Sequence, residues 1–150
     1  MIWKTFAELS TDELYAILKL RQDVFVIEQS CLFRDIDGRD REAHHLLAGW
    51  RAPETLGGCL RLLPPAGERS AVGIGRVVVH ADQRRTGLGR EMMAESIAYA
   101  ERTFGPVPVA LSAQTYLETF YNRLGFERCS DDYLDEGDIP HLDMLRPAPG

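Results

Sequence analysis

The sequence predicts a mixed α/β (α+β) domain, in which one sheet carries helices on both faces. Two patterns predict this class. Residues 45–79 contain three apolar stretches separated by turn residues, an arrangement typical of antiparallel strands. Further along, a helical pattern over 88–104 separates two strand-like stretches, as in a strand–helix–strand unit. With 150 residues, we expect a single domain spanning 1–150.

The N-terminal part is expected to begin with an edge strand within residues 1–8. Ser10 and Glu13 then have the spacing of a capping box, which marks a helix start. Apolar residues recur at helical spacing as far as Phe25, so we expect a helix of about four turns. The polar stretch 28–42 is predicted to be a long loop, and loops of that length in compact domains are usually functional.

The remaining elements follow from turn residues and apolar periodicity. A short helix over 117–124 is expected to end at Gly125, a typical C-cap residue. The last two strand patterns are expected to pair as a hairpin, and the tail from Pro147 to be frayed. The predicted strands are 45–50, 56–63, 72–79, 107–112, 126–133 and 141–145, and the long helix is 88–104.

The composition excludes several classes of function. A net charge of −6 argues against nucleic-acid binding, which usually needs a basic surface. The sequence shows neither an apolar run of about 20 residues nor a signal-peptide core, so we expect a cytoplasmic protein that does not act at a membrane. Cys31, Cys59 and Cys129 form no Cys-x-x-Cys pair, so neither a zinc knuckle nor a redox motif is expected.

The clearest functional signal lies between residues 75 and 90, where a strand runs through a turn rich in Arg and Gly into a helix. Gly87 and Gly89 allow a sharp turn, and the helix start offers unpaired N–H groups and a positive dipole end. Phosphate suits such a site. A Walker loop is excluded because no Gly-Lys-Ser/Thr follows, and Met92 replaces the third glycine of a dinucleotide fingerprint. The competing interpretation is a surface turn with solvated arginines.

Two signatures in this order resemble the GNAT superfamily of acetyl-CoA-dependent N-acetyltransferases. They are Arg84-x-x-Gly87-x-Gly89 and Phe120-Tyr121-x-x-x-Gly125-Phe126. A closer resemblance, to the ElaA-like subgroup, covers nearly the whole length. Its pieces are Arg21-x-x-Val24-Phe25-Val26-x-Glu28-Gln29, Asp35-x-Asp37, Ala113-Gln114 and Ile139-Pro140-His141-x-x-Met144.

The resemblance implies a mostly antiparallel mixed sheet that is splayed where acetyl-CoA binds as the acetyl donor. No metal is expected, because Asp35-x-Asp37-Gly38 lacks the length and the terminal Glu of a calcium loop. Gln114 stands where many relatives have Asn, and its longer side chain changes the reach toward a cofactor amide. The residues implied to bind the cofactor are Val77, Val78, Val79, Arg84, Arg85, Thr86, Gly87, Leu88, Gly89, Arg90 and Gln114.

The resemblance also implies that Tyr121 is the acid that protonates the leaving thiolate. An alternative for Tyr121 is core packing, because it lies on the apolar stripe of its helix. The base is left open among Glu28, His45, His141 and Asp138, and an amine of low pKa would need only an exit route for its proton.

The expected reaction is direct attack by a primary amine, from a small molecule or a peptide, in a ternary complex. The acidic stretches 35–42 and 131–136 either attract a cationic amine or are ordinary solvated loops. The alternatives in function are a non-catalytic acyl-CoA sensor and an acyltransferase with a longer acyl donor. We expect a monomer or a homodimer.

Overall fold

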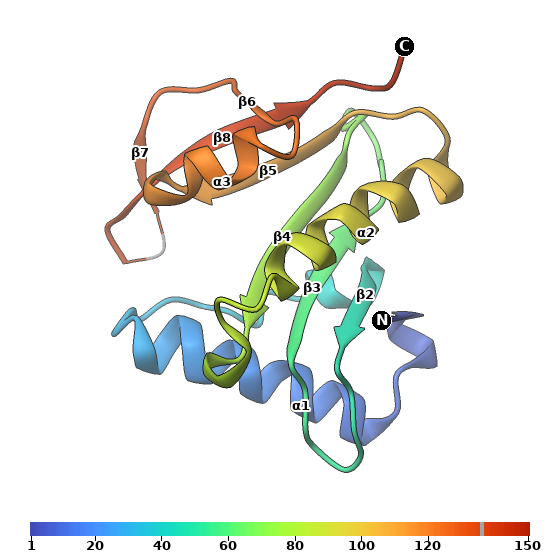
Figure 1. Ribbon diagram of the computed structural model, residues 1–150, viewed down its shortest axis with the longest axis vertical. Helices are drawn as coiled ribbons and strands as arrows, with labels where there is room; N and C mark the ends of the chain where they lie inside the picture. The colour runs from blue at the N-terminus through green and yellow to red at the C-terminus, as the bar shows by residue number, and fades with distance from the viewer. Residues whose placement is uncertain (136) are drawn as a thin grey trace.

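The computed structural model describes residues 1–135 and 137–150, which form one mixed sheet with helices on both faces (Figure 1). The sheet order is β1-β2-β3-β4-β5-β8-β6, and β7 also pairs with β8. The helices are α1 (Thr11–Arg21), α2 (Leu88–Phe104) and α3 (Glu118–Asn122). The strands are β1 (Ile2–Thr5), β2 (His44–Ala48), β3 (Gly58–Leu63), β4 (Val72–Val79), β5 (Val109–Gln114), β6 (Glu127–Arg128), β7 (Tyr133–Asp135) and β8 (Ile139–Arg146).

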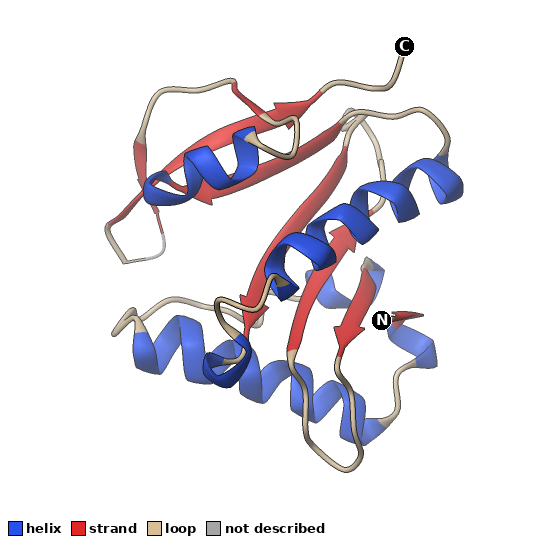
Figure 2. Ribbon diagram, viewed as in Figure 1, coloured by secondary structure: helices blue, strands red, loops and turns tan. Residues whose placement is uncertain are grey.

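Alternating side chains of the central strands supply a core on each side of the sheet. On β2, Leu46 packs in the cluster under α2, whereas its neighbour Leu47 packs in the cluster under α1. This follows from the two-residue period of a strand. Tyr121 of α3 belongs to the α2 cluster, so α2 and α3 cover one face and α1 the other (Figure 2). The predicted fold class is confirmed.

The sheet splits between β4 and β5, its one parallel pair among the described strands. These strands pair only at Val72–Val109 and Gly73–Ala110, and beyond Gly73 they diverge (Figure 2). The register of β4 against β3 also shifts near Arg76, whose φ is +52°, in the left-handed region. Such a bulge bends its strand. The expected splay is therefore present, at the C-terminal half of β4.

The first helix begins as predicted but extends further. Ser10 Oγ accepts from the Glu13 amide at 3.1 Å, and Glu13 Oε1 accepts from the Ser10 amide at 2.9 Å, which completes the capping box. Beyond Arg21 the chain continues as a π-helical segment, Gln22–Glu28. The helical conformation therefore runs past Phe25 to Glu28, and it carries that carboxylate to the edge of the split.

The last hairpin differs from the prediction. The stretch 126–133 is not one strand, because the chain leaves the sheet between β6 and β7. There Ser130 Oγ accepts from the Asp143 amide at 2.8 Å and Arg128 bonds to Asp132, so side chains replace part of the ladder. The N-terminal edge strand is confirmed. No helix in the described part of the chain has the length and apolar character needed to cross a bilayer.

Candidate active site

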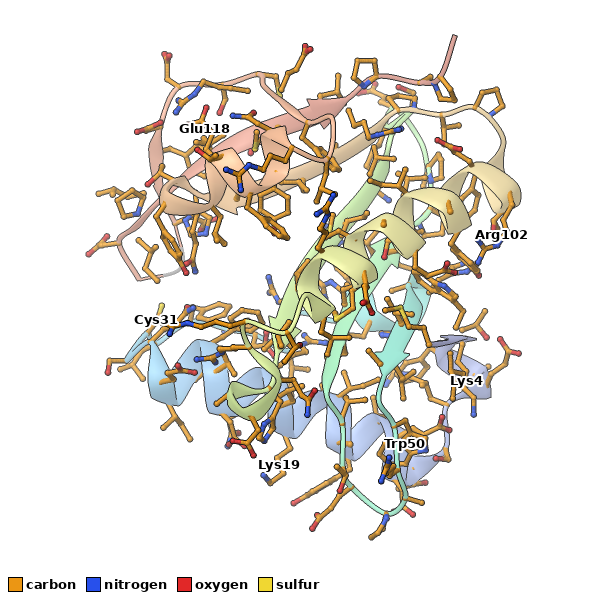
Figure 3. All side chains as sticks on the ribbon, in the orientation of Figure 1. Lys4, Lys19, Cys31, Trp50, Arg102 and Glu118 are labelled. Atoms are coloured by element: carbon orange, nitrogen blue, oxygen red, sulfur yellow. The ribbon has the colours of Figure 1, made fainter. Side chains whose placement is uncertain are left out.

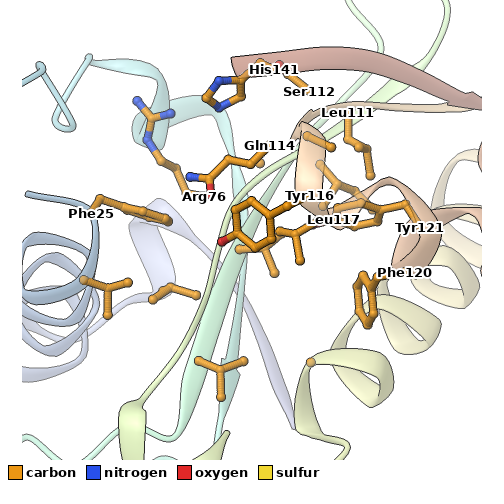
Figure 4. A pocket seen from close by; sticks show the side chains of 18 of the residues that line it. Phe25, Arg76, Leu111, Ser112, Gln114, Tyr116, Leu117, Phe120, Tyr121 and His141 are labelled. Atoms are coloured by element: carbon orange, nitrogen blue, oxygen red, sulfur yellow. The ribbon is translucent and has the colours of Figure 1, made fainter. Parts of the chain in front are cut away.

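A cleft of about 590 Å³ opens where β4 and β5 diverge (Figure 4). Its walls are the end of the first helical stretch, β4, the turn between β4 and α2 with the first residues of α2, β5, the segment leading into α3 with α3 itself, and β8. Nine sequence-predicted residues meet there: Glu28, Val77, Val78, Val79, Arg84, Gly89, Gln114, Tyr121 and His141. Arg85, Thr86, Gly87, Leu88 and Arg90 form the turn beside the cleft and do not line it.

The turn between β4 and α2 has the geometry of an anion site. Gly87 is the N-cap of α2 with φ +88°, and Arg85 also has a left-handed φ of +61°. Thr86 Oγ1 donates to the Gln83 carbonyl at 2.6 Å and holds the turn. The first amides of a helix have no intrahelical acceptor, and α2 is long enough, at 17 residues, for its dipole to add to them.

Glu28 and Arg84 form a two-pronged ion pair at the edge of the cleft. Arg84 Nη1 and Nη2 lie 2.5 and 2.6 Å from Glu28 Oε1 and Oε2. The hydrogen bonds from Arg84 lower the pKa of Glu28. In this arrangement Glu28 is held as a carboxylate with little tendency to take a proton, which does not favour it as the base.

Tyr121 packs in the core and also lines the cleft. Its ring lies edge-on to Phe120 and Phe126, with centroids 5.0 and 6.0 Å away, and only 6% of the residue is exposed. Burial raises the pKa of Tyr121 to about 12. Packing and a role in the cleft are therefore compatible, and the hydroxyl stays protonated at neutral pH.

The structure separates the two candidate histidines. His141 on β8 lies opposite Gln114 on β5 and lines the cleft. Its Nδ1 donates to the Ile139 carbonyl at 2.7 Å, so Nε2 carries the lone pair of the neutral ring. His45 on β2 does not line the cleft, and its Nε2 donates to the Asp40 carbonyl at 2.9 Å. Asp138 also lies outside the cleft lining. These placements favour His141 over His45 and Asp138.

The acidic loop 35–42 is neutralised by buried arginines. Arg21 Nε lies 3.0 Å from Asp35 Oδ2, and Arg21 Nη1 lies 2.7 Å from Asp40 Oδ1. Arg61 Nη2 lies 2.7 Å from Asp37 Oδ2, and this hydrogen bond lowers the pKa of Asp37. Because these carboxylates are already paired, the structure does not favour this loop as the acidic wall considered above for a cationic amine. Of the second stretch, Asp132 pairs with Arg128 at 2.6 Å, and Glu136 lies outside the described residues.

Sequence reasoning missed Arg61 and Arg76, which complete this network from β3 and β4. Arg76 Nε lies 2.9 Å from Asp35 Oδ1, and its guanidinium stacks over Phe33. Arg76 also lines the cleft. One signal was available for Arg61, since it interrupts the apolar strand Cys59-Leu60-Arg61-Leu62, where a charge has to be buried with a partner.

Two further side chains cross the cleft. Gln114 Nε2 donates to Gln29 Oε1 at 3.3 Å and joins β5 to the end of the first helical stretch. Tyr116, 74% exposed, projects into the cleft from the turn before α3 (Figure 4). Sequence reasoning missed Tyr116 because nothing in the pattern distinguishes it from a surface aromatic residue.

Comparison with known proteins agrees with this geometry. Residues 25–146 match the family described as acetyltransferase (GNAT) domain. The chain is 38% identical over 144 residues to a UPF0039 protein of Schizosaccharomyces pombe, covering 95% of this chain and 93% of that protein. It is 38% identical over 142 residues to protein ElaA of Escherichia coli, covering 93% and 91%. Its structure is similar to that of an acyl-CoA N-acyltransferase from Pseudomonas aeruginosa, with a TM-score of 0.88, 43% identity, and coverage of 97% of this chain and 99% of that one.

Proposed function

The chain belongs to the GNAT acetyltransferase family, and from this premise we propose that it moves an acetyl group from acetyl-CoA to a primary amine of a small molecule or peptide. One observation carries the proposal. A single cleft combines the β5-facing edge of β4 beyond Gly73, which has no strand partner among the described residues, with the edge of the turn over residues 84–90, here called the anion turn, and with Tyr121. A binding protein would need the first two features, whereas a buried phenol beside them suits group transfer.

The residues present fit acetyl-CoA. Beyond Gly73 the β5-facing edge of β4 has no strand partner among the described residues, so Val77, Val78 and Val79 offer backbone groups to the amides of a pantetheine arm. The turn over 84–90 and the α2 N-terminus suit a pyrophosphate. When bound, acetyl-CoA supplies the activated acyl group, and no metal is involved in the proposal.

The remaining chemistry belongs to side chains and backbone of the cleft. A backbone N–H near Val78 polarises the acyl oxygen where negative charge develops. Tyr121, with a pKa raised to about 12, keeps its proton and donates it toward the sulfur of the leaving group. His141 accepts the proton of the amine at Nε2, directly or through water, because its Nδ1–H is held by Ile139.

The experiment that tests this proposal measures thiol release from acetyl-CoA with a broad panel of amines, including peptide N-termini and polyamines. We expect release with at least one amine, and native mass spectrometry should show bound CoA and the acetylated product from a cell extract. CoA binding without release from any amine would favour a non-catalytic acyl-CoA sensor. Absence of CoA binding would contradict both functions.

A further inference from the structure

The end of the first helical stretch contacts both sides of the cleft. Glu28 is the last residue of this stretch, and both of its carboxylate oxygens accept hydrogen bonds from the Arg84 guanidinium of the anion turn. The next residue, Gln29, accepts a hydrogen bond from Gln114 of β5. Figure 1 shows this stretch beside the β4–α2 turn, at the mouth of the split sheet. One short segment therefore contacts the region expected to hold the donor and the region open to an acceptor.

The Glu28 carboxylate occupies the groups of Arg84 that a phosphate would use. A guanidinium fork binds carboxylate and phosphate with the same two-pronged geometry. The third nitrogen of Arg84, Nε, donates to the Val79 carbonyl at 3.4 Å, and both terminal nitrogens donate to Glu28. A pyrophosphate on this turn would lie close to the negative charge of Glu28. The two anions would compete for the same two terminal nitrogens of Arg84.

Glu28 is also the only acid among the described residues that line the cleft. The carboxylates of the neighbouring loop are paired with Arg21, Arg61 and Arg76. While Glu28 is bound to Arg84, the cleft therefore presents no uncompensated acid to a cationic amine. Release of Glu28 would supply one.

We propose that Glu28 is a substrate-binding residue that couples the two substrates. The pyrophosphate of the donor displaces Glu28 from Arg84, and the displaced carboxylate then binds the ammonium group of the acceptor. This inference rests on the proposed function, since it requires a CoA donor at the 84–90 turn. It predicts that the donor binds first, and it assigns the acceptor to the class of cationic primary amines.

The ion pair is suited to exchange because it is exposed. The side chains of Arg84 and Glu28 are 39% and 47% exposed, so separating them disturbs no core packing. Exposed pairs contribute little, and a pyrophosphate brings more charge than one carboxylate. Glu28 is the last residue of its helical segment, and Ser30, two residues later, has a φ of +51°, in the left-handed region. A shift of the Glu28 carboxylate would therefore disturb only the end of the helical segment and not its interior.

Calorimetric titration of CoA into the wild type, E28Q and E118Q tests the competition. Glu118, which Figure 3 labels, pairs with Arg128 through both oxygens, at 3.0 and 2.9 Å. The E118Q substitution therefore removes one negative charge, as E28Q does, from an ion pair of similar geometry. We expect E28Q to bind CoA about fivefold more tightly, the scale of a lost exposed pair, and E118Q to match the wild type. Pantetheine, which lacks the pyrophosphate, should bind all three proteins equally.

A second readout follows the displaced segment. Hydrogen exchange should show that CoA, but not pantetheine, speeds exchange at the amides of residues 29–31, which bond to carbonyls of the π-helical segment. For whichever amine of the panel gives thiol release, E28Q should raise the KM of that amine.

Three results would overturn the inference: weaker CoA binding by E28Q, CoA binding by E28Q equal to that by E118Q, or an unchanged KM for the amine. A wild type that does not bind CoA would instead contradict the proposed function itself. The two failures are therefore distinguishable.

Discussion

At the scale of single residues, Tyr121 shows why a sequence pattern alone leaves two interpretations open. Its place on an apolar helical stripe predicts packing, and the packing against Phe120 and Phe126 is present. The same burial that makes Tyr121 a core residue raises the pKa of its hydroxyl to about 12. The phenol therefore remains a proton donor throughout the pH range in which a thiol, with an ordinary pKa of about 8.5, becomes a thiolate.

Replacement of this hydroxyl should separate catalysis from binding. We expect Y121F to lower kcat by about a hundredfold, the lower end of what a positioned acid contributes, while CoA affinity and the unfolding midpoint change little. Steady-state kinetics and CoA titration check this. Because the pKa is raised, loss of the Tyr121 proton should not reduce wild-type kcat between pH 7 and 10. A kcat for Y121F near that of the wild type would assign the residue to packing alone.

At the scale of one element, the anion turn depends on two glycines for different reasons. Gly87 has φ +88°, a conformation in which a side chain is strained, although a Cβ there would meet no neighbour. Gly89 has ordinary helical backbone, and its Cβ would lie 3.6 Å from Val79, at the wall of the cleft. Gly87 is therefore needed for its backbone conformation, whereas Gly89 is needed to leave space for a ligand at the wall of the cleft.

Alanine at these two positions should therefore affect stability in opposite directions. We expect G87A to lower the free energy of unfolding by about 1 kcal/mol through backbone strain. G89A should leave stability unchanged or raise it by about 0.5 kcal/mol, because alanine is the better helix former. Both should weaken CoA binding. Urea unfolding and CoA titration measure these effects, and a G89A variant that binds CoA as tightly as the wild type would contradict the assignment.

The strand β2 gives the fold a defined pH dependence. Burial lowers the pKa of both His44 and His45 below the ordinary value of 6.5. When the pKa of a histidine is lower in the folded state, the folded protein binds fewer protons than the unfolded chain in the pH range between the two pKa values. The contribution of the neutral histidine to folding stability is therefore fully present above pH 6.5, and it is lost as the pH falls toward the folded pKa. Asp40 has a pKa lowered by Arg21 and Arg61 despite its burial, so its contribution is lost only below about pH 4.

The urea midpoint of the wild type should accordingly fall between pH 7.5 and pH 5, before the pH reaches the range in which Asp40, with its lowered pKa, is protonated. In H44Q/H45Q this fall should be much smaller, while the further loss below pH 4 remains. Gln can still donate to the Asp40 carbonyl, so the variant keeps a donor at that site. An equal fall in the double variant would assign the acid sensitivity to other groups.

The elements also show what the sequence predicts well. The capping box at Ser10, the sharp turn at Gly87 and the main strands could be predicted because each depends on neighbours within a few residues. The π-helical segment and the bulge at Arg76 were not, because contacts between distant segments hold them. The same holds within the candidate site: the turn was predictable from local chemistry, whereas the Glu28–Arg84 pair joins residues 56 positions apart.

At the scale of the whole molecule, the sheet consists of two halves, one ending at β4 and the other beginning at β5, and the seam between them is the short β4–β5 pairing. The order β5-β8-β6 places β8 between strands that precede it, which no local pattern specifies. Across the seam, β4 and β5 share two paired positions, and a common core cluster under α2 and α3 supplies the rest of the contact. A donor lying in the split would therefore act as an additional link between the halves.

This arrangement predicts that CoA stabilises the molecule as a unit. At a CoA concentration of 100 times its Kd, linkage gives about 2.7 kcal/mol, which for a domain of this size corresponds to a rise in Tm of about 5–11 °C. Because the ligand contacts both halves, hydrogen exchange should slow on β4 and on β5 together. Differential scanning calorimetry with CoA measures the shift, and G87A, in which CoA binding is expected to be weaker, should show a smaller one. Protection confined to β4 would mean that the donor lies along one strand edge without linking the halves, and the rise in Tm would then come from local contacts alone.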